Sequence, residues 1–153
     1  MRLRRVLLSF VAVGVTVTAA VAADKDAKGI VAVRQNVMDA NAGHITAIKF
    51  ILTEVPDQIK LVPAQAQAIA DSATVVPDLF PKGSDRPPSN ALPAVWEKPG
   101  DFKAAAQKAH ELAQKLAETA KGGDAKATLA AFGALGKEGC GGCHQTFRKR
   151  ENS

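Results

Sequence analysis

Proline is concentrated in the middle of this 153-residue chain, where the segment 77–100 holds six of the eight prolines. Proline has no backbone N–H and its ring clashes with the preceding helical turn, so proline at this density excludes a regular helix or a central strand. The segment is therefore expected to be a long connection. Its apolar residues indicate that parts of it pack down, and Trp96 is expected to cover the core.

On each side of this connection, two segments repeat apolar residues at steps of three and four, which is the period of an α-helix. No segment shows a convincing alternation of the strand type. The expected helices cover residues 30–51, 63–76, 101–121 and 124–147, with Asp101 and Asp124 as the N-caps of the last two. Four amphipathic helices with short turns and one long crossover predict an all-α fold, an antiparallel four-helix bundle, in which cofactors sit between facing helices.

The N-terminus has the pattern of an export signal. A basic stretch precedes an apolar run from Val6 to Val17, and small residues before Asp24 form a cleavage site. A membrane anchor is the weaker interpretation, because the run is short and ends in small residues. We therefore expect residues 1–23 to be a signal peptide, and residues 24–153 to be a single periplasmic domain with no membrane association after cleavage. The mild positive charge left after cleavage does not argue for a nucleic-acid partner.

The two cysteines of the chain stand in the string Cys140-Gly141-Gly142-Cys143-His144, near its C-terminal end. Such a CxxCH string is typical of covalent haem attachment, in which two thiols bond to the haem vinyl groups and the histidine ligates the iron. On a helix these three side chains share one face, so the spacing suits that chemistry. A redox dithiol needs a βαβ context and a structural zinc site needs four ligands, and the sequence offers neither. One haem c, held by two thioether bonds, is the expected cofactor.

The fourth helix is expected to carry this motif on its inward face. The predicted inward stripe consists of Leu129, Phe132, Gly136, Cys140, Cys143 and Phe147. Five glycines crowd the same helix, although each interior glycine costs roughly 1 kcal/mol relative to alanine. Two interpretations stay open: a bulky planar partner lies against the backbone, or the helix is kinked or frayed.

With His144 on one side of the iron, any ligand on the other side must come from upstream, because no Met, His or Cys follows. Met38 lies at the edge of the apolar stripe of the first helix and is either a ligand or core filler. His44 lies nearer the centre of that stripe and would give a bis-His iron. His110 lies off the stripe of its own helix and is expected at the surface.

Two arginines are candidates for the haem propionates. Arg34 lies one helical turn before Met38, and Arg148 lies one turn after His144, so either could reach a propionate through a charge-assisted hydrogen bond. For Arg148, a solvated cationic helix end that complements the helix dipole is an equal alternative.

Over nearly the whole length after the signal, the sequence resembles the class II c-type cytochromes, meaning cytochrome c′ and its low-spin relatives. The resemblance rests on the C-terminal CxxCH and on three supporting elements: Arg34-Gln35, Pro93-Ala94-Val95-Trp96 and Ala131-Phe132-Gly133, with Phe147-Arg148-Lys149 after the motif. It implies a left-handed antiparallel bundle with haem near one end, and an arginine at position 34 close to the propionates. In typical cytochromes c′ the residue four positions after that arginine is apolar and does not ligate. Here it is Met38, which looks like the low-spin branch with Met–His ligation.

A six-coordinate Met–His haem has no open site for substrate, so the expected function is one-electron transfer rather than enzymatic catalysis. The expected partners are periplasmic redox proteins that dock transiently, steered by basic residues near the haem end. The alternative is a five-coordinate haem protein that binds nitric oxide or carbon monoxide, as cytochromes c′ do. The resemblance also implies a homodimer through the first two helices.

Overall fold

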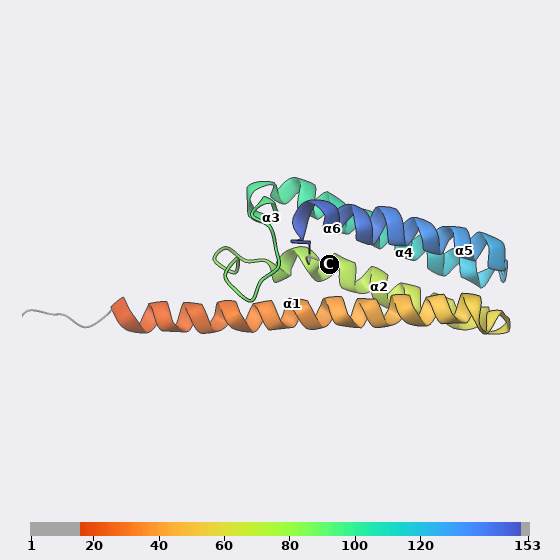
Figure 1. Ribbon diagram of the computed structural model, residues 1–153, viewed down its shortest axis with the longest axis horizontal. Helices are drawn as coiled ribbons and strands as arrows, with labels where there is room; N and C mark the ends of the chain where they lie inside the picture. The colour runs from red at the N-terminus through yellow and green to blue at the C-terminus, as the bar shows by residue number, and fades with distance from the viewer. Residues whose placement is uncertain (1–15, 151–153) are drawn as a thin grey trace, which may run out of the picture.

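The computed structural model describes residues 16–150, with side chains from residue 29 onward, and all of its regular elements are helical. The four long helical stretches form two layers (Figure 1). One layer holds α1 (Thr16–Thr53) and α2 (Val62–Val75), which are joined by the 3₁₀ helix η1 (Pro56–Leu61). The other holds α4 (Pro99–Lys121) and the stretch formed by α5 (Ala125–Ala134), η3 (Leu135–Gly141) and α6 (Gly142–Phe147). The predicted all-α four-helix bundle is confirmed.

The connection between the two layers is largely irregular, as its prolines predict. It begins with the 3₁₀ helix η2 (Val76–Leu79), contains the single turn α3 (Ala94–Glu97), and lies at one end of the bundle beside α6 (Figure 1). Trp96 is half-buried and packs on the core, and its indole Nε1 donates to the carbonyls of Phe80 at 3.0 Å and Pro81 at 3.1 Å. The prediction that Trp96 covers the core is confirmed.

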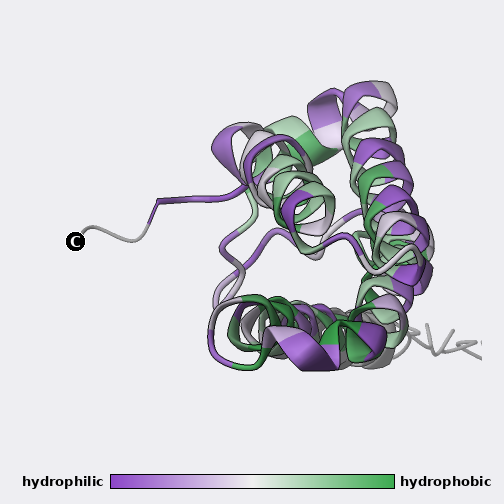
Figure 2. Ribbon diagram, turned by 90° about the vertical axis from the view of Figure 1, so that its right-hand side faces the viewer, coloured by the Kyte–Doolittle hydropathy of each residue, from purple (hydrophilic) through white to green (hydrophobic). Residues whose placement is uncertain are grey.

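The interior has two parts. A larger cluster, which we call the bundle core, is formed by aliphatic residues and alanines of α1, α2, α4 and η3, including Ile48, Val62, Leu116 and Leu135. A second cluster, which we call the aromatic cluster, lies at the end with the connection and contains Val76, Val95, Phe102 and Phe147, with Met38, Phe80, Trp96 and Cys143 against it. Apolar and polar residues alternate along the helices in the view along the long axis (Figure 2), and the apolar ones that face the neighbouring helices form the two clusters.

The helix ends match the prediction at α5 but not at α4. Asp124 is the N-cap of α5, and its carboxylate accepts a hydrogen bond from the Ala127 amide at 3.0 Å. The prediction of Asp101 as an N-cap was wrong, because α4 begins two residues earlier at Pro99 and its N-cap is Lys98. Proline is favoured in the first turn of a helix, since its fixed φ is already helical and its missing N–H needs no partner there.

The predicted inward stripe of the fourth helix was wrong at Leu129 and Gly136, although Phe132 between them packs against the bundle core. Leu129 is 52% exposed and Gly136 is also exposed, whereas Thr128, Leu135 and Gly139 are buried. The stripe assumes 3.6 residues per turn throughout, but η3 is a π-helical segment, whose wider turns shift the phase of the helix. From Cys140 onward the prediction holds, because the half-buried Cys140 and Cys143 and the buried Phe147 all contact the interior.

The predicted signal peptide covers residues 1–23, of which residues 1–15 lie outside the described part of the chain, as do the side chains of the remainder. The signal peptide, and the division at residue 24, therefore stay predictions. Within the described residues, no helix combines the length and apolar character needed to cross a membrane.

Candidate functional site

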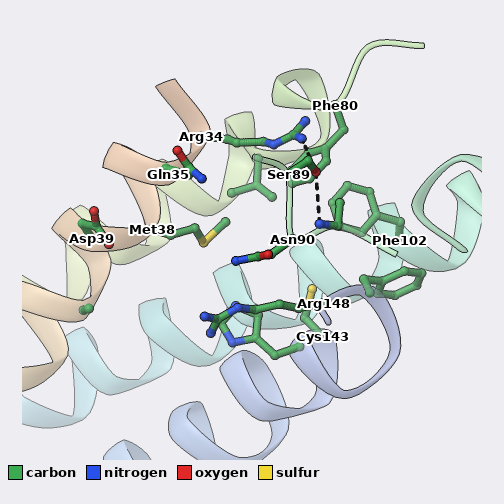
Figure 3. A pocket seen from close by; sticks show the side chains of 15 residues that line it. Arg34, Gln35, Met38, Asp39, Phe80, Ser89, Asn90, Phe102, Cys143 and Arg148 are labelled. Carbon is green, nitrogen blue, oxygen red and sulfur yellow. Dashed lines mark hydrogen bonds between the residues drawn. The ribbon is translucent and has the colours of Figure 1, made fainter. Parts of the chain in front are cut away.

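A cavity of about 550 Å³ opens between α1, the connection and α6 (Figure 3). This volume falls within the usual range for small-molecule and cofactor sites. One part of its wall is apolar and belongs mainly to the aromatic cluster. The other part is polar and combines buried residues, such as Arg34 and Ser89, with exposed ones. The apolar wall is formed by Met38, Ala42, Val76, Phe80, Ala91, Phe102 and Phe147, and the other lining residues are Arg34, Gln35, Asp39, Ser89, Asn90, Cys143, His144 and Arg148. A cavity with one apolar wall and one polar wall suits a flat ligand that has an apolar body and charged edges.

The haem motif lies where α6 meets the cavity. Cys143 and His144 line the cavity, while Cys140 packs one turn earlier against the bundle core. Burial raises the pKa of the Cys140 thiol, and burial together with the nearby Cys140 raises the pKa of Cys143 to about 11. Burial, and secondarily the charge of Arg148, lowers the pKa of His144. The site therefore favours neutral thiols and a neutral imidazole, the form of histidine that ligates a metal.

The surroundings of the two cysteines argue against the two other functions of a CxxCH string, a redox-active dithiol and a structural zinc site. A redox-active CxxC depends on a lowered thiol pKa, and both thiols here have raised values. A structural zinc site needs four ligands, and among the described residues no group of three or more His, Cys, Asp or Glu side chains is arranged to hold a metal ion. The predicted thioether attachment is the chemistry that fits this pair of cysteines.

Met38 reaches into the same cavity from α1, on the side opposite Cys143 and Arg148 (Figure 3). His44, the rival ligand, is not among the lining residues; its Nδ1 lies 2.7 Å from Oε1 of Gln65 on α2. The structure thus brings Met38 and His144 to one cavity and places His44 at the contact between α1 and α2.

His110 lies at a contact between α4 and α2. It is half-buried, with Nδ1 2.9 Å from the carbonyl oxygen of Ala70, so the prediction that it is a surface residue was wrong.

Arg34 is only 4% exposed and is bound to the connection. Nη1 donates to the Ser84 hydroxyl at 2.9 Å and to the Leu79 carbonyl at 3.4 Å, and Nη2 donates to the Ser84 carbonyl and the Ser89 hydroxyl, both at 2.6 Å. The guanidinium also lies 4.5 Å from the centre of the Phe80 ring, within cation–π range. Burial lowers the pKa of Arg34, opposed by the charge of Asp85.

These contacts change the interpretation of Arg34. The four N–H directions of Nη1 and Nη2 all point to oxygens of the connection, which leaves Nε–H as the donor that could serve a propionate. Arg34 therefore fixes one wall of the cavity, since the connection contributes Phe80, Ser89 and Asn90 to it. Sequence reasoning missed the two serines, although Ser84 and Ser89 are polar residues that a proline-rich connection could present to a buried cation.

The end of α6 is joined to the connection by backbone hydrogen bonds. The Leu92 amide donates to the Phe147 carbonyl at 2.9 Å and the Lys149 amide donates to the Asn90 carbonyl at 2.8 Å, on either side of an isolated antiparallel bridge between Ala91 and Arg148. This pairing holds Arg148 at the rim of the cavity, where it is exposed. Asn90, which sequence reasoning also missed, reaches the cavity through the same pairing (Figure 3).

Comparison with known proteins identifies this arrangement. The family model described as Cytochrome C′ matches residues 29–148, which include both axial candidates and the haem motif. The chain belongs to the cytochrome c′ family. It is 34% identical over 149 residues to cytochrome c′ of Rhodospirillum rubrum, covering 95% of this chain and 97% of that one. It is 36% identical over 124 residues to cytochrome c-556 of Agrobacterium tumefaciens strain II Chrys, covering 80% of this chain and 99% of that one.

Solved structures agree with the family assignment. Cytochrome c′ from Thermochromatium tepidum superimposes with a TM-score of 0.72 at 26% identity, covering 81% of this chain and 97% of that one. Cytochromes of this family bind one covalent haem c, and the two cysteines of this chain, in its CxxCH string, are consistent with that cofactor. The residues present fit the group: the neutral thiol of Cys143 and the neutral imidazole of His144 line a cavity of suitable size with apolar and polar walls, and the neutral thiol of Cys140 lies one turn earlier.

Proposed function

We propose that the cavity holds haem c between Met38 of α1 and His144 of α6, and that the protein carries single electrons between periplasmic partners. The observation that supports this most strongly is the placement of Met38. Its side chain reaches into the cavity that Cys143 and His144 line, while His44 is hydrogen-bonded to Gln65 outside it. A bound haem c supplies one-electron redox chemistry and an iron that accepts imidazole, thioether or diatomic gas ligands.

The surrounding residues suit an electron carrier. Met38 and His144 belong to different helices that line the cavity, and the aromatic cluster that forms its apolar wall restricts water and movement. If both side chains occupy axial positions, no position is left for a substrate, so we propose no enzymatic activity. A thioether ligand also raises the reduction potential relative to a second histidine.

Gas binding is the second candidate, and it has the more direct support from related structures. Neighbours with the same fold include a nitric oxide complex and a carbon monoxide complex of cytochrome c prime variants from Alcaligenes xylosoxidans, each 24% identical to this chain. In this second function Met38 is a displaceable neighbour of the iron, and the same cavity takes nitric oxide or carbon monoxide on the α1 side.

Location and assembly follow the same proposal. The predicted signal peptide supports a periplasmic protein, since haem is attached to exported c-type cytochromes outside the cytoplasm. A solved cytochrome c′ with a TM-score of 0.74 and 26% identity is described as showing ligand-controlled dimer dissociation, and we propose that this chain also forms a homodimer. We further propose transient docking with acidic redox partners, for which the exposed Lys137, Lys149 and Arg150 supply positive charge.

The two functions predict different kinetics. We would measure carbon monoxide binding to the reduced holoprotein, and its rate of electron exchange with a small acidic redox protein at several salt concentrations. Met38→Leu is the matched variant, because leucine keeps the volume of methionine without the sulfur. The electron carrier predicts slow gas binding that becomes much faster in Met38→Leu, with fast, salt-sensitive electron exchange in the wild type. Gas binding equally fast in both proteins, with slow electron exchange, would establish the second function instead.

A further inference from the structure

The haem motif begins inside a π-helical segment. The segment η3 covers Leu135–Gly141 and therefore includes Cys140, and it passes into the α-helix α6 just before Cys143. π-Helical turns are rare and occur frequently at functional sites, where they change the direction in which later side chains point. The position of η3 indicates that the chain uses this irregularity to orient the motif.

The buried positions show what η3 achieves. Leu135, Gly139, Cys143 and Phe147 follow one another at steps of four, and each contacts the interior. In an α-helix of 3.6 residues per turn, each step of four rotates the side chain by about 40°, so such a series soon leaves the buried face. The wider π turns remove part of this rotation. They allow Leu135 to reach the bundle core while Cys143, eight residues later, still lines the cavity.

Gly139, in the middle of η3, touches the backbone of α4. A Cβ built on Gly139 would lie 3.3 Å from the Cα of Ala109, 3.6 Å from its Cβ and 3.1 Å from Cδ1 of Leu135. The Leu135 methyl can turn away, but the Ala109 Cα belongs to a helix backbone. By contrast, a Cβ on Gly133 or Gly136 meets nothing within 4 Å. Of these three glycines, Gly139 is the one whose missing side chain allows close helix contact.

The α4 side of this contact is the more firmly held. Next to Ala109, Nδ1 of His110 lies 2.9 Å from the carbonyl oxygen of Ala70, which joins α4 to α2. The outer side of η3, at Gly136, Lys137 and Glu138, is exposed. Extra volume at the contact would therefore move η3 outward rather than α4 inward.

We propose that Gly139 is a positioning residue for the haem: its contact with Ala109 sets the depth and rotation of the Cys140–His144 motif, and hence the distance between His144 and Met38. This inference rests on the proposed Met38–His144 site. Bound through Cys140, Cys143 and His144, the haem would be attached to η3 and α6, whereas Met38 and most of the apolar wall belong to other elements. A displaced η3 would therefore alter the strain on His144 as well as its distance from Met38, and Met38 would be the ligand lost.

The test compares Gly139→Ala with Gly136→Ala in the holoprotein. We expect Gly139→Ala to retain the helical circular dichroism spectrum and the covalent haem. Its absorption spectrum should show a high-spin fraction. It should also bind carbon monoxide about tenfold faster, which corresponds to a loss of about 1.4 kcal/mol in Met38 ligation. Gly136→Ala should keep the wild-type spectrum and a rate within about twofold, because its methyl enters open space. A wild-type spectrum and rate in Gly139→Ala would overturn the proposal.

Two further measurements keep the result interpretable. Ala109→Val adds volume from the α4 side without changing a residue of the haem motif. It should therefore reproduce the effect even if the Gly139→Ala protein does not acquire its haem, and an unchanged absorption spectrum of Ala109→Val would contradict the proposal.

In a Met38→Leu background, resonance Raman of the reduced protein reports the bond between iron and His144 directly. A shifted iron–histidine frequency on adding Gly139→Ala supports the positioning role even if Met38 proves not to be a ligand. An unchanged frequency would refute it independently of the proposed function.

Discussion

Arg34 and Ser84 are joined by two hydrogen bonds across fifty residues of sequence: Nη1 donates to the Ser84 hydroxyl at 2.9 Å, and Nη2 donates to the Ser84 carbonyl at 2.6 Å. With the bond from Nη2 to the Ser89 hydroxyl, they attach the proline-rich connection to α1. The connection forms part of the cavity wall, so the geometry of the haem site depends on this buried cation.

Replacing Arg34 should therefore destabilise the whole protein. Arg34→Met keeps an unbranched apolar side chain but removes the donor to both oxygens of Ser84 and one of the two donors to the Ser89 hydroxyl, and should lower the free energy of unfolding by about 3 kcal/mol. Denaturant unfolding of the holoprotein measures it. Gln35→Ala is the control, because the exposed Gln35 makes a longer bond to the Pro88 carbonyl at 3.3 Å, and should cost about 0.5 kcal/mol or less. Equal losses in the two variants would show that Arg34 does not hold the connection.

The N-cap of α5 gives a second test, with a matched aspartate. Asp124→Ala removes the acceptor for the Ala127 amide and should cost about 1 kcal/mol of stability. Asp101 lies in the first turn of α4, after its N-cap, so Asp101→Ala should lose only the interaction with the helix dipole, about 0.3 kcal/mol. Thermal unfolding of both variants measures the difference. A larger loss at Asp101 would restore the N-cap predicted from the sequence.

The buried thiol predicts a dependence of stability on alkaline pH. Burial raises the pKa of Cys143 to about 11 in the folded chain, above its ordinary value of 9.0. A folded-state pKa above the unfolded value gives stability that is complete below the unfolded pKa and is lost as pH rises through the folded one. Haem-free protein should therefore lose stability between about pH 9 and about pH 11. The holoprotein, whose thiols are thioethers, should lack this component, and so should haem-free Cys143→Ala. Denaturation at several alkaline pH values compares the three, and an identical pH dependence in all of them would contradict the assignment.

Local patterns in the sequence predicted most of the fold. The period of apolar residues located the four long helical stretches, and the prolines located the connection, because both effects act within a few residues. The haem motif and Met38 could be proposed for the same reason, since a CxxCH string and a methionine after Arg34 are readable without knowledge of the fold. Their meeting in one cavity required the structure.

The features that sequence reasoning missed depend on distant contacts. Arg34 meets Ser89 across fifty-five residues, in a segment with no periodic pattern to indicate the pairing. The exposure of Leu129 follows from the π-helical segment, which a period of 3.6 cannot represent. The glycines of the fourth helix left open a planar partner or a kink, and Gly139 adds close contact with Ala109, which was not considered.

The central claim, that Met38 faces the iron opposite His144, is tested most directly by absorption spectra of the oxidised and reduced holoprotein. The wild type should be low-spin in both states, with the weak charge-transfer band of an iron–thioether bond in the oxidised state. That band should vanish in Met38→Leu and persist in His44→Leu, because His44 is bonded to Gln65 away from the cavity. A high-spin reduced wild type, or a band that survives in Met38→Leu, would contradict the account.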